Sequence, residues 1–131
     1  MYHFHIDIDG GIDEVVDKTL AALKEEGFGV LMDLDIQATL KAKLGVERAP
    51  YRILGACNPP LANQALEAEP DIGVLLPCNV VVRGLGDGRV RVSFMDPQAV
   101  LSMVDNPQVA ELAAEVKARL ERVRDSLAGE G

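Results

Sequence analysis

The sequence lacks most of the features that assign a chain to a functional class. Its 131 residues include no tryptophan, two histidines and two cysteines. The longest run without a charged residue, Ile53 to Leu66, spans 14 residues and contains two prolines. A membrane-spanning helix needs about 20 apolar residues, so we expect no membrane partner. The N-terminal segment shows no basic region followed by an apolar one, which predicts no secretory signal and a cytoplasmic protein.

Positive charge is also scarce. Lysine and arginine total 13 against 21 aspartate and glutamate residues, which gives a net charge of -8. This charge repels phosphate backbones, and the five aromatic residues offer few stacking platforms, so nucleic acid is not expected as a partner. Cys57 and Cys78 form no Cys-x-x-Cys pair. Both are expected to be reduced in the cytoplasm.

Sequence motifs of the common enzyme and cofactor-binding classes are missing. The chain contains no Gly-x-Ser-x-Gly, no Walker A loop, no dinucleotide-binding glycine pattern and no His-Glu-x-x-His, so we predict no cofactor. His3 and His5 project from one face of a predicted strand, in a row that Asp7 continues. Because no further histidine is present to complete a transition-metal site, we predict no metal.

Hydrophobic patterning indicates a single α+β domain over residues 1–131. Apolar residues recur at helical spacing over 12–26 and 107–128, and shorter helices are predicted after the capping residues Asp35, Asn58 and Asp96. Alternating or continuous apolar character predicts five strands, at 2–9, 28–34, 51–57, 75–82 and 90–94. The two long helices are expected to pack on the apolar face of the sheet.

Three segments carry a resemblance to a known family. They are Glu26-Gly-Phe-Gly-Val30, Tyr51-Arg-Ile-Leu-Gly-Ala-Cys-Asn-Pro59 and Ile72-Gly-Val-Leu-Leu-Pro-Cys-Asn-Val-Val81. Over roughly Asp9 to Leu101 the chain resembles the domain of unknown function 302 family. The resemblance implies a curved, mainly antiparallel five-stranded sheet in β-α-β-β-β-β-α order, with helices on one face and a TATA-binding-protein-like topology. It also implies a tendency to dimerise, and it implies no biochemical activity.

The two Cys-Asn pairs are the first candidate site. Cys57 precedes a predicted helix start, where free N–H groups and the helix dipole can stabilise a thiolate. The alternative is that Cys57 and Cys78 are small core residues and Asn58 is a helix cap. Antiparallel pairing of the two strands would bring both pairs into one locality, with Asn79 pointing to the face opposite Cys78.

A second candidate is a set of polar residues on the sheet face opposite the apolar one. Strand parity predicts that they share this face, where three arginines can focus a positive potential for a small anion or carboxylate. The alternative is a solvated face balanced by Asp7 and Asp33. The residues in this set are His5, Arg52, Asn79, Arg83, Arg91 and Ser93.

These observations predict a binding module for a small ligand, with an anionic ligand favoured, as the function. The predicted ligand-binding residues are Arg52, Cys57, Asn58, Cys78 and Asn79. The alternative is a thiol-dependent enzyme or a sulfur-handling protein that uses Cys57 as its nucleophile. We also expect a homodimer, because the apolar sequence around 72–82 exceeds what two helices cover.

Overall fold

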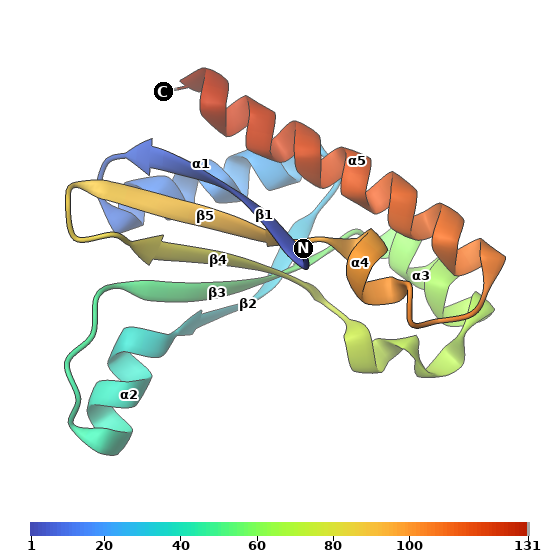
Figure 1. Ribbon diagram of the computed structural model, residues 1–131, viewed down its shortest axis with the longest axis horizontal. Helices are drawn as coiled ribbons and strands as arrows, with labels where there is room; N and C mark the ends of the chain where they lie inside the picture. Colours follow the sequence, from blue (N-terminus) through green and yellow to red (C-terminus); the bar gives the residue numbers. More distant parts are fainter. Residues whose placement is uncertain (131) are drawn as a thin grey trace.

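The computed structural model describes residues 1–130 and contains a curved five-stranded antiparallel sheet (Figure 1). The strand order is β1-β5-β4-β3-β2, so the first two strands of the chain lie at opposite edges. The α+β class, the strand number and the antiparallel pairing are as predicted. The strands are β1 (His3–Asp9), β2 (Gly29–Asp35), β3 (Tyr51–Cys57), β4 (Cys78–Gly84) and β5 (Arg89–Met95).

Two long helices, α1 (Ile12–Glu25) and α5 (Pro107–Glu130), cover one face of the sheet, as predicted. The opposite face carries no covering helix layer and is called the open face below. Helix α2 (Ile36–Leu44) projects away from the sheet beyond one end of β3 (Figure 1). At the other end lie α3 (Pro59–Ala68), the short 3-10 helix η1 (Pro70–Leu75) and α4 (Pro97–Leu101).

The short helices begin where the sequence places capping residues. The Asp35 carboxylate accepts a hydrogen bond from the backbone N–H of Ala38 at 2.9 Å, and Asn58 accepts one from Leu61 at 3.3 Å. Asp96 accepts two, from the N–H groups of Gln98 and Ala99. Each cap satisfies N–H groups that have no partner within the helix, which explains why these starts are readable from local sequence.

One strand boundary differs from the prediction. The strand expected over 75–82 begins at Cys78 and runs to Gly84, and Leu75, the first residue of the expected strand, is the last residue of η1. Pro77 lies between the two elements and has no N–H to donate to a neighbouring strand. The apolar character of Leu75 and Leu76 reflects packing against a second core cluster rather than membership of the sheet.

The interior has two hydrophobic clusters. The larger lies between the sheet, α1 and the C-terminal half of α5, with Leu54, Val80, Val92 and Phe94 fully buried at its centre. The smaller joins α3, η1, α4 and the N-terminal half of α5. Helix α5 therefore packs against both clusters. None of the helices within residues 1–130 has the length and apolarity needed to cross a membrane.

A β-bulge in β2 overturns part of the predicted face assignment. The pairing of β2 with β3 shifts between Val30 and Met32, so that Asp33 lies opposite Leu54 on the helix-covered face. Arg52 has the same orientation as Leu54 and lies opposite buried Val82. The prediction that Arg52 shares the open face with the other arginines is therefore wrong. Its strand is apolar at both parities, and parity alone does not reveal which side is buried.

Candidate functional site

A cavity of about 440 Å³ lies where the sheet meets α3, η1, α4 and α5. We call it the end-of-sheet cavity. Its wall consists almost entirely of aliphatic, aromatic and sulfur-containing groups, and Asn58 supplies the only polar side chain among the described residues that line it. The other principal wall residues are Phe28, Met32, Ala56, Cys57, Leu61, Ala62, Ala65, Leu76, Pro77, Cys78, Pro97, Leu101, Leu112 and Val116.

All three segments that carry the family resemblance contribute to this wall. Phe28 comes from the Gly-Phe-Gly turn before β2, Cys57 from the end of β3, and Cys78 from the start of β4. Ala56 pairs directly with Cys78 in the antiparallel ladder. The predicted proximity of the two strand segments is therefore confirmed.

Asn58 holds the first of these segments against the second. Its side chain caps α3 and donates a long hydrogen bond, 3.5 Å, to the carbonyl of Glu26. Arg119 of α5 donates to the same carbonyl at 3.1 Å. Gly27 turns the chain with a φ of 85°, and a Cβ there would lie 2.9 Å from the Asn58 amide. Asn58 is 7% exposed, and the two hydrogen bonds of its side chain are to backbone groups of Glu26 and Leu61. Its amide therefore stabilises the wall of the cavity rather than pointing into the space inside.

Gly55 permits close packing of two residues that line the cavity, Met32 and Pro77. A Cβ at this position would meet Met32 Cε and Pro77 Cγ, each at 3.0 Å. Real Cβ atoms rarely show contacts this short, and the proline ring has little freedom to move. Glycine therefore lets Met32 and Pro77, which both line the end-of-sheet cavity, pack closely over β3 at this position.

The two thiols differ in environment although both line the end-of-sheet cavity. Cys57 is half-buried, Cys78 is buried, and no disulfide joins them. Burial, with a smaller contribution from nearby Cys57, raises the pKa of the Cys78 thiol to about 11. Cys78 is therefore held as a neutral thiol at physiological pH, in keeping with a role as a wall residue.

Arg52 and Asn79 lie outside this cavity. Arg52 donates to Asp33 through Nε at 2.8 Å, forms a second contact with that carboxylate through Nη2, and lies 3.5 Å from Asp13. The hydrogen bonds to Asp33 raise the pKa of Arg52 further above its ordinary value. Asn79 projects from the open face, where it lines a separate cavity. Of the five predicted residues, Cys57, Asn58 and Cys78 thus meet at one place.

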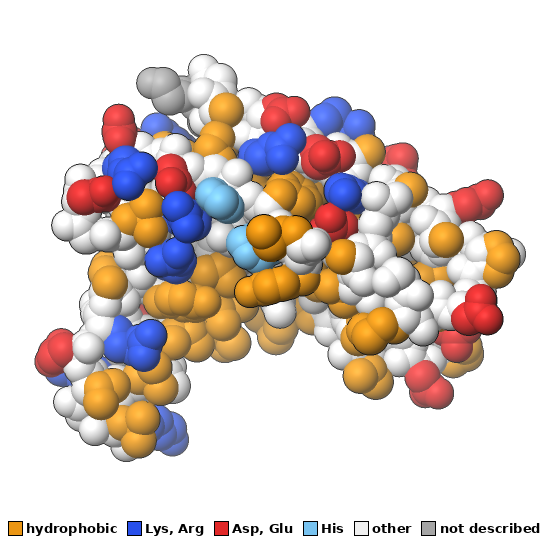
Figure 2. All heavy atoms as spheres, in the orientation of Figure 1, with side chains coloured by type: hydrophobic (Ala, Val, Ile, Leu, Met, Phe, Trp, Pro, Cys, Tyr) orange, Lys and Arg blue, Asp and Glu red, His pale blue; other side chains and the backbone are white. Residues whose placement is uncertain are grey.

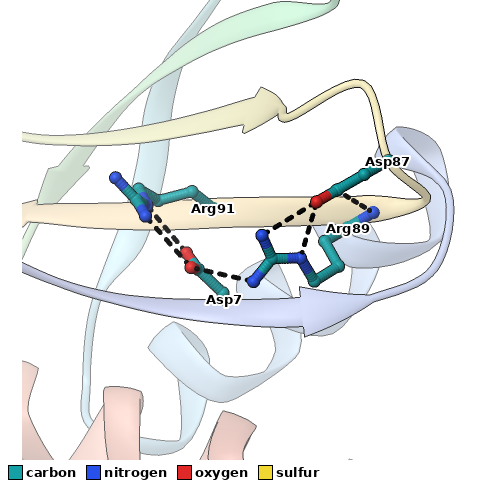
Figure 3. A network of polar contacts seen from close by, with 4 residues as sticks. All are labelled: Asp7, Asp87, Arg89 and Arg91. Atoms are coloured by element: carbon teal, nitrogen blue, oxygen red, sulfur yellow. Dashed lines mark hydrogen bonds and ion pairs between the residues drawn. The ribbon is translucent and has the colours of Figure 1, made fainter.

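The open face carries a charged region near the β4–β5 hairpin (Figure 3). Arg91 holds Asp7 through two hydrogen bonds, of 2.7 and 3.0 Å, and Arg89 bridges Asp7 to Asp87. The bonds from Arg91 lower the pKa of Asp7, against the smaller opposing effect of burial. Asp7 balances charge on this face as the solvated-face alternative predicts, whereas Asp33, the second carboxylate of that alternative, lies on the helix-covered face.

The rings of His3 and His5 lie 6.1 Å apart on the open side of β1. Across residues 1–130, no three or more histidine, cysteine, aspartate or glutamate side chains are grouped so that they could hold an ion.

Several wall residues could not be identified as site residues from the sequence. Pro97 and Leu101 come from α4, and Leu112 and Val116 from α5. Their apolar spacing predicts only a buried helix face. Phe28 is not among the predicted ligand-binding residues either, although it lies in the Gly-Phe-Gly motif that carries the family resemblance.

The fold and the cavity define a small α+β protein in which an apolar space lies between the end of the sheet and a group of helices. The family model for the domain of unknown function DUF302 matches residues 4–127, and the chain belongs to this family. It is similar to the crystal structure of an uncharacterized conserved DUF302 protein from Bacillus stearothermophilus. The two share 31% sequence identity, with a TM-score of 0.88 over 96% of this chain and 98% of that chain. No functionally curated protein matches the chain.

Proposed function

We propose that the protein is a binding module for a small, neutral, apolar molecule held in the end-of-sheet cavity. The observation that carries the proposal is the convergence of the three family-motif segments on the wall of one cavity. Its volume of about 440 Å³ lies within the range of about 300–1,000 Å³ typical of small-molecule pockets. Apolar lining of this kind recognises a ligand through shape and removal of apolar surface from water.

The chemistry of the wall favours a neutral ligand over the anionic ligand that the sequence predicts. The anionic expectation depended on Arg52 and on free N–H groups at the start of α3. Arg52 is paired with Asp33, and the Leu61 N–H is bonded to the Asn58 side chain. Burying an unpaired charge in such a cavity would carry a large desolvation cost.

The proposal is tested with N-phenyl-1-naphthylamine, a neutral probe whose fluorescence rises in apolar surroundings. At about -0.3 kcal/mol for each of its roughly 17 non-hydrogen atoms, saturable binding with a Kd on the order of 0.1 mM or tighter is expected. Ala62 lines the cavity, and Ala62→Trp should abolish the fluorescence rise by filling the space.

Asn63→Trp is the matched control, because Asn63 is the next residue of α3 and is exposed. This variant should bind the probe as the parent does. Circular dichroism and thermal unfolding establish that both variants are folded. A folded Ala62→Trp variant that binds the probe with the parent's affinity would show that the ligand site lies elsewhere.

The alternative function, thiol-dependent catalysis at Cys57, has less support from the cavity. A cysteine nucleophile needs a base, and the described wall residues include no imidazole or carboxylate. Both histidines lie on β1, three strands from β3, which corresponds to about 14 Å at ~4.8 Å per strand. The unpaired cysteines suit a reducing compartment, and we place the protein in the cytoplasm on this ground.

We also propose a homodimer formed through the apolar part of the open face and the β2 edge. Met32 and Leu34 are 44% and 49% exposed there, on an edge strand with free backbone hydrogen-bonding groups. Sedimentation velocity should show a species of twice the 14.1 kDa chain mass, and Leu34→Asp should shift it toward monomer. A parent protein that sediments as a 14.1 kDa species across micromolar concentrations would contradict the proposal.

A further inference from the structure

A second cavity, of about 360 Å³, lies on the open face and differs in chemistry from the first. We call it the sheet-face cavity. It extends over Val81 of the central strand β4, with Arg83 toward one end and Asn79 toward the other. Tyr51 on β3 and Ser93 on β5 flank it, because they pair with Arg83 and Val81 respectively. Figure 2 shows a band of hydrophobic side chains on this underside of the molecule, beside blue basic groups.

Arg83 differs from the other arginines of the sheet. Arg52, Arg89 and Arg91 each contact at least one carboxylate. Arg83 is half-buried and forms no ion pair with any of the side chains that the structure describes, those of residues 1–129. It also lies directly opposite Arg91 in the β4–β5 pairing. Like charges placed opposite one another on a sheet are destabilising, and Asp7 forms hydrogen bonds with Arg91 but none with Arg83.

We infer that the sheet-face cavity binds a small aromatic carboxylate, with Arg83 as its anchor. The planar guanidinium can donate two parallel hydrogen bonds to a carboxylate and so supplies the missing counter-charge. The aromatic ring of the ligand would lie over Val81, beside Tyr51 and Met95. A carboxylate is favoured over phosphate because the wall is built on paired strands and offers no cluster of free backbone N–H groups.

The site is independent of the proposed apolar function, since the two cavities have no lining residue in common. Arg83→Gln should therefore leave N-phenyl-1-naphthylamine binding unchanged. A variant that binds neither N-phenyl-1-naphthylamine nor the aromatic carboxylate would indicate general unfolding, which thermal denaturation detects separately.

The inference is tested by titrating benzoate into ¹⁵N-labelled protein at constant ionic strength, with benzamide as the uncharged ligand of matched shape. Benzoate should move the signals of residues on β3, β4 and β5 saturably, and benzamide should bind about tenfold more weakly or worse. Arg83→Gln should weaken benzoate binding by about tenfold or more. Arg48→Gln is the control, because Arg48 is exposed in the segment between α2 and β3 and away from the cavity.

Three results would overturn the inference. Equal affinity for benzoate and benzamide would show that the negative charge of the ligand does not contribute to binding. An unchanged affinity of the Arg83→Gln variant for benzoate would show that Arg83 does not anchor the ligand. If benzoate causes no saturable shift while Arg83→Gln alters sedimentation, Arg83 makes contact with a second copy of the chain instead.

Discussion

Cys78 should react with iodoacetamide at neutral pH about 100-fold more slowly than an unperturbed thiol. Its pKa is raised from 9.0 to about 11, chiefly by burial, and each unit lowers the thiolate fraction tenfold. The thiolate is the reacting form, so the rate should keep rising with pH until about 11. Because the folded state holds this proton more tightly than the unfolded state, folding stability should fall as pH rises from about 9 toward 11.

The measurement uses Cys57→Ser, which leaves Cys78 as the only thiol, and Cys78→Ser, which leaves Cys57. Both variants should react at similar rates once unfolded in urea, which controls for intrinsic reactivity. Rapid alkylation of Cys78 in the folded protein at neutral pH would contradict the prediction. Rapid alkylation of Cys57 would support the alternative function, thiol-dependent catalysis. Slow reaction of both thiols would rule out that function.

Asp96→Ala should lower the free energy of unfolding by about 2–3 kcal/mol. Asp96 is 9% exposed, caps α4 through two hydrogen bonds, and pairs with Lys117 of α5 at 2.9 Å. Loss of a cap costs about 1 kcal/mol, and a partly buried lysine left without its partner adds to that cost. Helix α4 supplies Pro97 and Leu101 to the end-of-sheet cavity, so probe binding should weaken as well.

The contribution of Asp96 to folding stability should be present at neutral pH and be lost in acid. Burial is the largest influence and opposes ionisation, but the bonds from Lys117, Ala99 and Gln98 together lower the pKa of Asp96. A lowered folded-state pKa contributes stability above the unfolded value, near 4, and this contribution is lost as pH falls through the folded-state pKa. Urea denaturation of the parent and Asp96→Ala should therefore differ most at neutral pH and converge in acid.

Asp96→Asn is the matched control, because asparagine can still cap α4 but carries no charge for Lys117. At neutral pH its loss of stability relative to the parent should be smaller than that of Asp96→Ala, and this loss should shrink as pH falls through the folded-state pKa of Asp96. If both variants lose the same stability, the ion pair with Lys117 accounts for the whole effect and the cap for none.

Elements governed by local interactions could be predicted from the sequence. Asp35, Asn58 and Asp96 cap the helices that follow them, since a cap forms within three residues of its own position. The long helices α1 and α5 follow from apolar spacing, because a stripe at 3.6-residue period must be buried on one side. The pairing of Ala56 with Cys78 follows from antiparallel connection of neighbouring strands.

The face on which Arg52 lies could not be predicted. Ile53 and Leu54 are adjacent and both apolar, so either parity of β3 could face the core. The bulge at Leu31 then places Asp33 on the same side as Arg52. A bulge changes the face of every later residue in its strand, and no local signal announces it here.

The sequence by itself therefore determined the helix and strand inventory, the caps and the neighbourhood of the two Cys-Asn segments. Tertiary structure alone decided that Phe28, Cys57 and Cys78 enclose an apolar space with residues of α3, α4 and α5. It also decided that Arg83 lies between Tyr51 and Arg91 with no carboxylate partner among the described side chains of residues 1–129, while its neighbour Arg91 is paired. Cavities and ion pairs join residues distant in the chain, and their geometry depends on how whole elements pack rather than on local preferences.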